Sequence, residues 1–313
     1  MRYIFILAVF IFLAGVSTSW PGVKGPVKPD VNFFIAGPAS IEDNEAIPNP
    51  FDNLELEAKA AAILDLSDDK IIFEKESGLE WPLASLTKLV TAVVSYDIGG
   101  NLLKEGAIII PITSDAVLQE GDDGFLVGES YNAKDLEEAM LVRSSNDAAY
   151  ALALWARENN GIYDESWFVN EMNMFVSRLG LHKTYFLNST GLDVDDRLSG
   201  AYGTAEEVAR LFSWLVKNRP DLITATSRPQ ITIYSVQGRK HVFDSSAMPI
   251  MRIPELIAVK SGYTDIAGGN LVLAYGVGPG HQFVAVILGS SYDGRFADAL
   301  KLYEAVSEYV RSI

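Results

Sequence analysis

The chain has 313 residues, 49% of them hydrophobic, and a formal net charge of −16, so its size fits one large domain or two small ones with an acidic surface. Such a surface repels phosphate backbones, which argues against nucleic acid as a partner. No cysteine is present, and this excludes disulfides, thiol nucleophiles and thiolate metal sites.

Histidine is also scarce. His182, His241 and His281 are the three histidines, and they form neither an H-x-x-x-H pair nor an H-E-x-x-H motif. We interpret each as an ordinary surface or core side chain. The sequence therefore predicts no metal site and no cofactor.

The first 19 residues have the layout of a secretory signal peptide. Arg2 supplies a basic start, residues 3–16 form a near-continuous apolar run, and small residues at positions 17–19 form a cleavage region. The run is short for a membrane span, which takes about 20 residues. We therefore expect an exported, extracytoplasmic protein, and an uncleaved N-terminal membrane anchor is the alternative.

Residues 20–55 are rich in Pro, Gly and Asp and keep no period of 2 or 3.6. This is typical of a linker or of a segment that wraps the domain surface. The pattern changes at Leu56, where an apolar strand, a polar turn at residues 67–69 and a second strand at residues 71–74 predict a hairpin. The folded domain is expected to span residues 56–313.

Helical periodicity dominates from Trp81 to about residue 217, and strand-like runs return after it. The predicted helices cover residues 85–98, 113–118, 134–158, 164–179 and 204–217. The predicted later strands cover residues 230–236, 255–260, 270–277 and 282–289. An amphipathic helix over residues 294–312 closes the chain. This order predicts an α+β fold, in which the N- and C-terminal segments share one antiparallel sheet, helices flank it, and an all-helical subdomain of about residues 85–217 is inserted.

Three short motifs occur in order: S-L-T-K at residues 85–88, S-S-N at residues 144–146 and K-S-G at residues 260–262. Each is common by chance, and the chain holds two decoys of the same form. Residues 67–70 repeat S-x-x-K in the polar hairpin turn, and residues 130–132 repeat S-x-N in a polar stretch. Neither context would perturb a pKa, so the first set is the candidate site.

The chemistry of these residues suits nucleophilic catalysis. A serine hydroxyl needs an adjacent base, and a lysine three residues along a helix lies on the same face as Ser85. Lys88 can act as that base only if its pKa falls through burial or through a neighbouring cation, for which Lys260 is the candidate. Ser144 and Asn146 would bridge the two lysines. Their alternative role is to cap the next helix, which Ser and Asn both suit.

In this order the motifs resemble the motif set of penicillin-binding proteins and serine β-lactamases. The wider context is similar to the D-alanyl-D-alanine carboxypeptidase family, the low-molecular-weight penicillin-binding proteins, over residues 56–313. The likeness is carried by the stretches PLASLTKLVTA, GESYNAKDLEEAMLVRSSNDAAYALA, YFLNSTGLDVDD with YGTAEEVARL, and VKSGYTDIAGGNLVLA. The resemblance implies a β-lactamase/DD-peptidase-like fold and a serine-type D-Ala-D-Ala carboxypeptidase that trims the terminal D-alanine of peptidoglycan stem peptides.

The resemblance also implies roles for the first two motifs. Ser85 would attack the peptide carbonyl and become acylated, and Lys88 would take its proton. Ser144 would relay the proton to the leaving amine, and Asn146 would hold Lys88 and the substrate amide. β-Lactam antibiotics would be covalent inhibitors at the same serine.

The third motif and the residues after it would bind the substrate, through Lys260, Ser261, Gly262, Tyr263 and Thr264. Lys260 and Ser261 would receive the terminal carboxylate, with Thr264 as a helper. Gly262 would let the substrate approach the strand backbone closely. The backbone N–H groups of Ser85 and Tyr263 would form the oxyanion hole.

Some features depart from the family pattern. Ser261 stands where Thr is commoner, and residues 241–259 match poorly, so substrate contacts there are open. Some relatives add a second β-rich domain and a C-terminal anchor after the final helix. This sequence shows neither, so any membrane tether is expected at the N-terminus.

Three other functions are compatible with a scaffold of this kind. A D,D-endopeptidase would cut peptidoglycan crosslinks with the same residues, and a one-domain chain is compatible with it. A class A β-lactamase needs a glutamate in an E-x-x-L-N pattern, where this chain has Thr184 in TYFLN. A non-enzymatic binding module is disfavoured, because all three motifs are intact.

Overall fold

The computed structural model describes residues 49–164 and 166–313. The predicted signal peptide or anchor, residues 1–19, and the predicted linker up to residue 48 lie outside the described residues. Within the described ranges, no helix is long and apolar enough to cross a bilayer. All of these described residues belong to one compact unit. It includes residues before the expected boundary at Leu56, because the Phe51 ring packs against other aromatic rings of the unit.

Five antiparallel strands form the main sheet, in the order β10-β11-β12-β1-β2. Their bounds are β1 (Ala60–Asp65), β2 (Lys70–Lys75), β10 (Leu256–Thr264), β11 (Gly268–Gly276) and β12 (Gln282–Ser290). The first of these strands pairs with the last, with Ala60 opposite Leu288 and Asp65 opposite Phe283. The predicted α+β fold with a sheet shared by the N- and C-terminal segments is confirmed.

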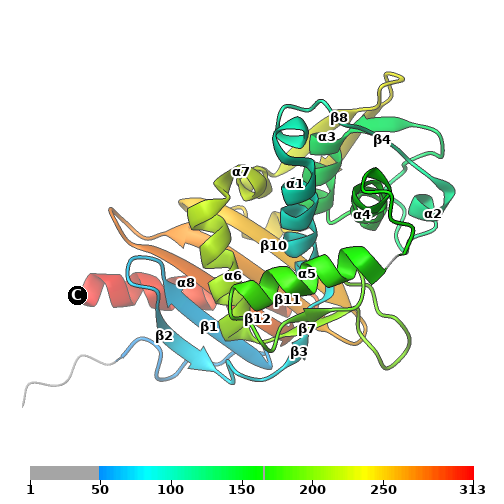
Figure 1. Cartoon of the computed structure of the whole chain (residues 1–313). Helices are drawn as coiled ribbons and strands as arrows, with labels where there is room; N and C mark the ends of the chain where they lie inside the picture. Colours follow the sequence, from blue (N-terminus) through cyan, green and yellow to red (C-terminus); the bar gives the residue numbers. More distant parts are fainter. Residues whose placement is uncertain (1–48, 165) are drawn as a thin grey trace, which may run out of the picture. The chain divides into compact units, whose positions relative to one another are not determined.

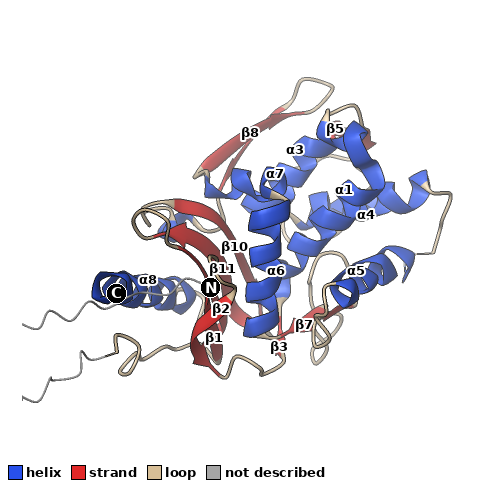
Figure 2. Cartoon of the chain, turned by 60° about the vertical axis from the view of Figure 1, so that its left-hand side comes forward, coloured by secondary structure: helices blue, strands red, loops and turns tan. Residues whose placement is uncertain are grey.

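Helices cover both faces of this sheet, which explains why its inner strands are apolar at almost every position. The covering helices are α6 (Ala205–Asn218) and α8 (Gly294–Ser312). Figure 2 shows them on opposite sides of the strands. Side chains alternate between the faces of a strand, so Ala62 and Leu64 join the hydrophobic cluster on the α6 side, whereas Ala61 and Ile63 join the cluster on the α8 side.

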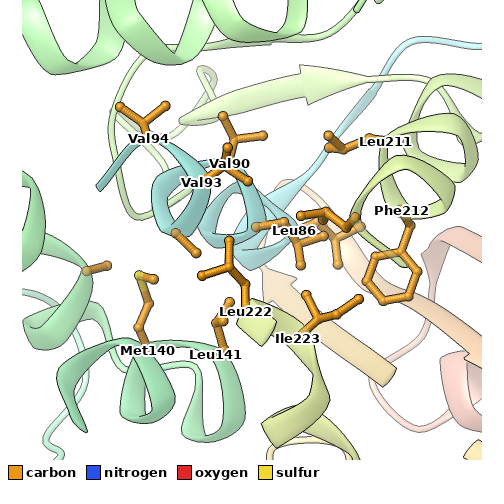
Figure 3. Close-up of a cluster of buried hydrophobic side chains, with 14 of the residues drawn as sticks. Leu86, Val90, Val93, Val94, Met140, Leu141, Leu211, Phe212, Leu222 and Ile223 are labelled. Atoms are coloured by element: carbon orange, nitrogen blue, oxygen red, sulfur yellow. The ribbon is translucent and has the colours of Figure 1, made fainter. Parts of the chain in front are cut away.

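The helical subdomain lies between the two parts of the sheet in sequence, and Figure 1 shows its helices α1, α3 and α4 above the sheet. Its helices are η1 (Ala84–Thr87), α1 (Lys88–Lys104), α2 (Ser114–Val117), α3 (Ala133–Glu138), η2 (Ala139–Arg143), α4 (Asn146–Asn159) and α5 (Ser166–Arg178). Helix α1 is central, since it contacts α3, α4, α5 and η2. Figure 3 shows Leu86 and Val90 in one buried cluster with Leu141 of η2 and Leu222 of α7 (Pro220–Ile223).

Short strands also lie within this subdomain and directly before it, and the subdomain is therefore mainly rather than purely helical. They are β3 (Trp81–Pro82), β4 (Ile109–Pro111), β5 (Ser130–Asn132), β6 (Tyr185–Phe186) and β7 (Ala201–Gly203). They form one sheet in the order β3-β7-β6 and a second from β4 and β5. The sequence did not predict them, because a strand of two or three residues is too short to show a period.

The predicted strand over residues 230–236 exists but does not join the main sheet. It is β8 (Gln230–Tyr234), which pairs only with β9 (Lys240–Asp244), a strand that the sequence did not predict. Every second residue of both strands is buried, since one face of this hairpin packs against η2 and α3. Two short helices, η3 (Thr224–Ser227) and η4 (Met248–Ile250), complete the described elements.

Candidate active site

Ser85 lies in the single turn η1 that leads into α1. Ala84 before it has a left-handed backbone with φ 48°. Ser85 is partly exposed, whereas Lys88 is fully buried. The Lys88 Nζ lies 2.9 Å from the Ser85 Oγ, as expected for two side chains three residues apart on one helical face.

Lys88 is held by three oxygen acceptors. Its Nζ donates to the Ser85 Oγ at 2.9 Å, the Asn146 Oδ1 at 2.7 Å and the Thr190 carbonyl at 2.7 Å. Burial lowers the pKa of Lys88 to about 7, and the negative charge of Asp123 opposes this shift. A large share of the amine is therefore unprotonated at neutral pH, which a general base requires.

The predicted helix over residues 134–158 is interrupted at the second motif. The π-helical turn η2 ends at Ser144, which is left-handed with φ 71°. The hydroxyl of Ser145 then caps α4 by accepting the Ala148 N–H at 3.2 Å. The N-cap of α4 is therefore Ser145, and the capping role considered for Ser144 and Asn146 is not what the structure shows. This leaves the Ser144 side chain for Lys260 and the Asn146 side chain for Lys88.

Lys260 enters the same site from β10 and is also buried. Its Nζ donates to the Ser144 Oγ and to the Ser261 carbonyl, both at 2.7 Å. Burial is the main cause that lowers the pKa of Lys260, followed by the positive charges of Lys88 and Arg295. The sequence left open whether burial or a neighbouring cation would lower the pKa of Lys88. Burial is the main cause.

The rest of the third motif lies where β10 contacts η1. The Ser261 Oγ donates to the Ser246 Oγ at 2.8 Å, so the poorly matching stretch before the motif does reach the site. A Cβ on Gly262 would lie 3.0 Å from the Ser85 amide nitrogen. Tyr263 is exposed beside it, with 44% of its surface accessible.

Thr264, at the end of β10, is held by a hydrogen bond to a residue outside the strand. Its hydroxyl donates to the Asp193 Oδ1 at 3.0 Å. The structure thus places Thr264 four residues along the strand from Lys260. Of the nine predicted site residues, Ser85 lies in η1, Lys88 begins α1, Ser144 and Asn146 lie just before and at the start of α4, and the other five lie on β10.

The loop of residues 188–193 was not given a role from the sequence. Gly191 has φ 81°, and a Cβ there would lie 2.0 Å from the Ala84 carbonyl oxygen, so the loop is pressed onto the Ser85 turn. The Asn188 Oδ1 accepts the Gly191 N–H at 2.7 Å and so holds the turn. The available signal was the run N-S-T-G, whose residue types favour turns.

Arg295 and Asn270 were also missed, because neither stands in a motif. The Arg295 guanidinium is buried over the Tyr292 ring, 4.2 Å from its centroid, and its charge lowers the pKa of Lys260. The Asn270 Nδ2 donates to the Pro82 carbonyl at 2.8 Å. It thereby ties the segment that leads to Ser85 to the main sheet.

Comparison with known proteins agrees with this geometry. The family model of D-alanyl-D-alanine carboxypeptidases matches residues 45–291. The chain is 27% identical over 262 residues to the D-alanyl-D-alanine carboxypeptidase DacA of Escherichia coli, which covers 79% of this chain and 60% of that protein. It is 26% identical over 259 residues to a D-alanyl-D-alanine endopeptidase of Pseudomonas aeruginosa, covering 79% of this chain and 76% of that protein. The chain therefore spans about 60% of the length of the first relative.

Solved structures share the fold. Penicillin-binding protein D2 of Listeria monocytogenes, in its ampicillin-bound form, superposes with a TM-score of 0.65 at 28% identity, covering 81% of this chain and 98% of that chain. The carboxypeptidase DacD of Francisella tularensis superposes with a TM-score of 0.69 at 22% identity over 81% and 71% of the two chains, which shows a common fold. Because the family model matches most of the sequence, the chain belongs to the D-alanyl-D-alanine carboxypeptidase family.

Proposed function

We propose that this protein is a serine-type D-Ala-D-Ala carboxypeptidase, which trims the terminal D-alanine of peptidoglycan stem peptides and is acylated by penicillin. The observation that carries the proposal is the buried Lys88 amine, 2.9 Å from the Ser85 hydroxyl and lowered in pKa to about 7. A serine beside such a base can become a nucleophile without a histidine.

In the acylation step, the neutral Lys88 amine takes the proton of the Ser85 hydroxyl as the Oγ bonds to the carbonyl carbon of the penultimate D-alanine. The electron pair of the C=O bond moves to its oxygen. The N–H groups of Ser85 and Tyr263 would stabilise this oxyanion. The position of Gly262 supports this, because the absent Cβ leaves the strand close to the Ser85 amide.

In the next step the carbonyl reforms and the C–N bond to the terminal D-alanine breaks. The leaving nitrogen needs a proton, and this would be the proton that Lys88 took from Ser85. Ser144 would pass it from Lys88 to the nitrogen, while Lys260 keeps its own charge and holds the Ser144 hydroxyl in the site by a hydrogen bond of 2.7 Å. The carboxylate of the leaving D-alanine would bind Lys260 and the Ser261 hydroxyl. A carboxylate next to Lys260 raises the pKa of that ammonium, so Lys260 is charged while substrate is bound.

Water then hydrolyses the acyl-enzyme. The position where a class A β-lactamase carries its glutamate holds Thr184, whose hydroxyl donates to Glu207 at 2.6 Å. This supports a peptidase whose β-lactam ester is long-lived, over a β-lactamase. The ampicillin-bound form of a relative at 28% identity supports penicillin binding by this chain as well.

A D,D-endopeptidase is the second candidate, in which the leaving amine belongs to a crosslinked neighbour. The endopeptidase relative favours it, since the alignment covers 76% of that protein, against 60% of the first carboxypeptidase relative. The two reactions share the acyl-enzyme and differ only in the leaving group.

Digestion of purified peptidoglycan fragments, followed by mass analysis, tests both activities. A carboxypeptidase shortens uncrosslinked pentapeptides by one alanine and leaves crosslinked dimers intact, whereas an endopeptidase converts dimers to monomers. The Ser85→Ala variant is the control and should do neither. If the wild-type protein yields neither product, the proposed function is wrong.

An enzyme of this kind must reach the cell wall, so the proposal includes export through the signal peptide of residues 1–19. Sequencing the N-terminus of the mature protein from cells tests this. A start near Trp20 supports cleavage, and an intact Met1 in the membrane fraction supports the anchor and tether. Full-length protein in the cytosol would contradict both.

A further inference from the structure

Glu129, Tyr131 and His241 form a chain of hydrogen bonds that lies outside the three motifs. None of the three residues is more than 9% exposed. The Tyr131 hydroxyl lies 2.9 Å from the Glu129 Oε2 and 2.7 Å from the His241 Nε2. We propose that these three residues position Asn146 for catalysis, because they hold the loop of residues 119–128 against its side chain. This inference rests on the proposed function, since its effect is on the acylation of the catalytic serine.

The hydrogens of this network can be placed from the chemistry of its members. An ionised carboxylate only accepts, so the single proton of the Tyr131 hydroxyl goes to Glu129. The Tyr131 oxygen then accepts from His241, which places a proton on Nε2. Burial lowers the pKa of His241, and although the charge of Glu129 opposes this shift, the ring is mainly neutral at pH 7. His241 therefore acts as a neutral donor that orients the Tyr131 hydroxyl toward the carboxylate.

The network fixes one end of the loop. The Glu129 Oε2 also accepts the Leu126 N–H at 3.1 Å. The Phe125 ring stacks on His241, with 5.3 Å between the ring centroids, and meets Tyr131 edge-on at 5.1 Å. Phe125 is only 5% exposed, so apolar packing anchors the loop there as well as hydrogen bonds. The strands β5 and β9, which carry the tyrosine and the histidine, thus hold this end of the loop in place.

The other end of the loop reaches the second motif. The Asn146 Nδ2 donates to the Glu120 carbonyl at 2.6 Å. The nearby Arg143 Nε donates to the Asp123 Oδ1 at 3.0 Å. A carboxamide can turn either its oxygen or its NH₂ group toward a neighbour. Because the Glu120 carbonyl only accepts, it takes the NH₂ group and leaves the Asn146 Oδ1 for the Lys88 amine at 2.7 Å.

The loop therefore decides which atom of Asn146 meets the catalytic base. If the loop moves away, the Asn146 NH₂ group loses its acceptor and is free to turn toward Lys88. It would then donate to the lone pair of the neutral amine. That lone pair must take the Ser85 proton in the acylation step, so the base would be blocked. Loosening the network should slow acylation by this route.

The experiment measures the second-order rate of acylation by penicillin at pH 8, per active site that is finally titrated, so a loss of folded protein cancels. Tyr131→Phe should lower this rate roughly tenfold, since it removes a hydrogen bond to a charged group. His241→Phe keeps a ring for stacking but removes the N–H, and should lower the rate roughly fivefold. His241→Gln keeps an N–H donor and should restore the rate to within about twofold of the wild type.

Tyr275→Phe is the matched control. Tyr275 is fully buried like Tyr131, and its hydroxyl has no hydrogen-bond partner in the part of the chain that the structure describes. Removing that hydroxyl should leave the acylation rate unchanged. A second comparison uses the Asn146→Ala background, in which the amide is gone. Because the network acts through Asn146, Tyr131→Phe should lower the rate less than about twofold in that background.

Wild-type rates in both Tyr131→Phe and His241→Phe would overturn the positioning role, and so would an equal loss in Tyr275→Phe. An effect of Tyr131→Phe that is as large in the Asn146→Ala background would overturn it too. If Tyr131→Phe yields no titratable site, the histidine variants decide, and equal rates in His241→Phe and His241→Gln would overturn the role. All these results leave the carboxypeptidase proposal standing. A wild-type protein that penicillin does not acylate would contradict the proposed function, and the positioning role with it.

Discussion

Residues 67–70 and residues 85–88 share the spacing S-x-x-K and differ in their surroundings. In the hairpin turn the Ser67 hydroxyl donates to Asp65 at 2.7 Å, and Lys70 is exposed. At the site, the Lys88 amine is fully buried and bonds to the serine three residues before it. The difference teaches that this spacing brings the two groups together on a helix, and that desolvation then lowers the pKa of the lysine.

The two regions also differ in which parts of the chain surround the serine and the lysine. The decoy turn connects β1 and β2, and although Asp69 within it bonds to Ser213 and Lys217 of α6, residues 67–70 are exposed. Lys88 is enclosed by residues distant in sequence, since its partners Asn146 and Thr190 are 58 and 102 residues away. The surroundings of Lys88 are therefore a product of the whole domain, whereas the Ser67 hydroxyl bonds within its own turn.

The largest expected difference between the two regions is in acylation by penicillin. Ser85→Ala should abolish the covalent adduct completely, because the nucleophilic oxygen is gone. Ser67→Ala should leave it unchanged, since that hydroxyl bonds only to Asp65. Intact mass after incubation with the drug gives the answer, and peptide mapping locates the adduct. Any adduct that persists in Ser85→Ala would refute the assignment of the nucleophile.

The second largest difference is expected between Lys88 and Lys70, the lysines of the two S-x-x-K stretches, in their effect on the acylation rate. Arginine cannot be deprotonated in a protein, so Lys88→Arg should lower the second-order acylation rate by the contribution of a general base, roughly 10²–10⁴-fold. Lys70→Arg should have no effect. Lys260→Arg keeps the charge and should retain measurable acylation while it weakens turnover of peptides with a free carboxylate. Equal losses in Lys88→Arg and Lys260→Arg would show that the roles are assigned wrongly.

Gly191→Ala tests whether the loop on η1 creates the environment of Lys88. A Cβ there meets the Ala84 carbonyl oxygen at 2.0 Å, so the loop must move and admit water to the lysine. We expect a roughly fivefold or larger loss of acylation rate at pH 7, since a rise of one unit from a pKa of about 7 lowers the unprotonated fraction of the amine from about one half to about one tenth. Gly180→Ala is the control, because Gly180 is also left-handed, with φ 77°, but has nothing within 4 Å of the position of a Cβ. Comparable losses in both variants would contradict the role of the loop.

The smallest expected effect is a shift in pH dependence. The base must be unprotonated, so the wild-type acylation rate should fall as pH drops below about 7, the pKa of Lys88, and level off above it. Removing a nearby positive charge raises the pKa of a lysine, so Lys260→Ala should move this rise to higher pH. Burial is the main cause of the low value, and the shift should therefore be less than about one unit. A rate that is flat from pH 5 to 9, or a shift to lower pH, would contradict the assignment.

Part of the fold followed from local patterns. The hairpin turn at residues 67–69, the strand over residues 270–277 and the helix over residues 204–217 were predicted close to their observed positions, because each has a clear period or turn signal. The break at Ser144 could not be predicted, since the helical pattern continues on both sides of it. The separate β8–β9 hairpin was missed because a period of 2 shows that one face is buried but does not show against what.

The sequence by itself determined the order of the three motifs, the scarcity of histidine and the absence of cysteine, and these predicted a serine–lysine chemistry with nine candidate residues. Only the tertiary structure decided which S-x-x-K is enclosed, that burial rather than Lys260 mainly lowers the pKa of Lys88, and that His241 bonds to Tyr131. The physical reason is that a pKa and a hydrogen-bond partner depend on what surrounds a group in space. Segments such as α4 and the loop of residues 188–193 reach Lys88 only when the whole domain is folded.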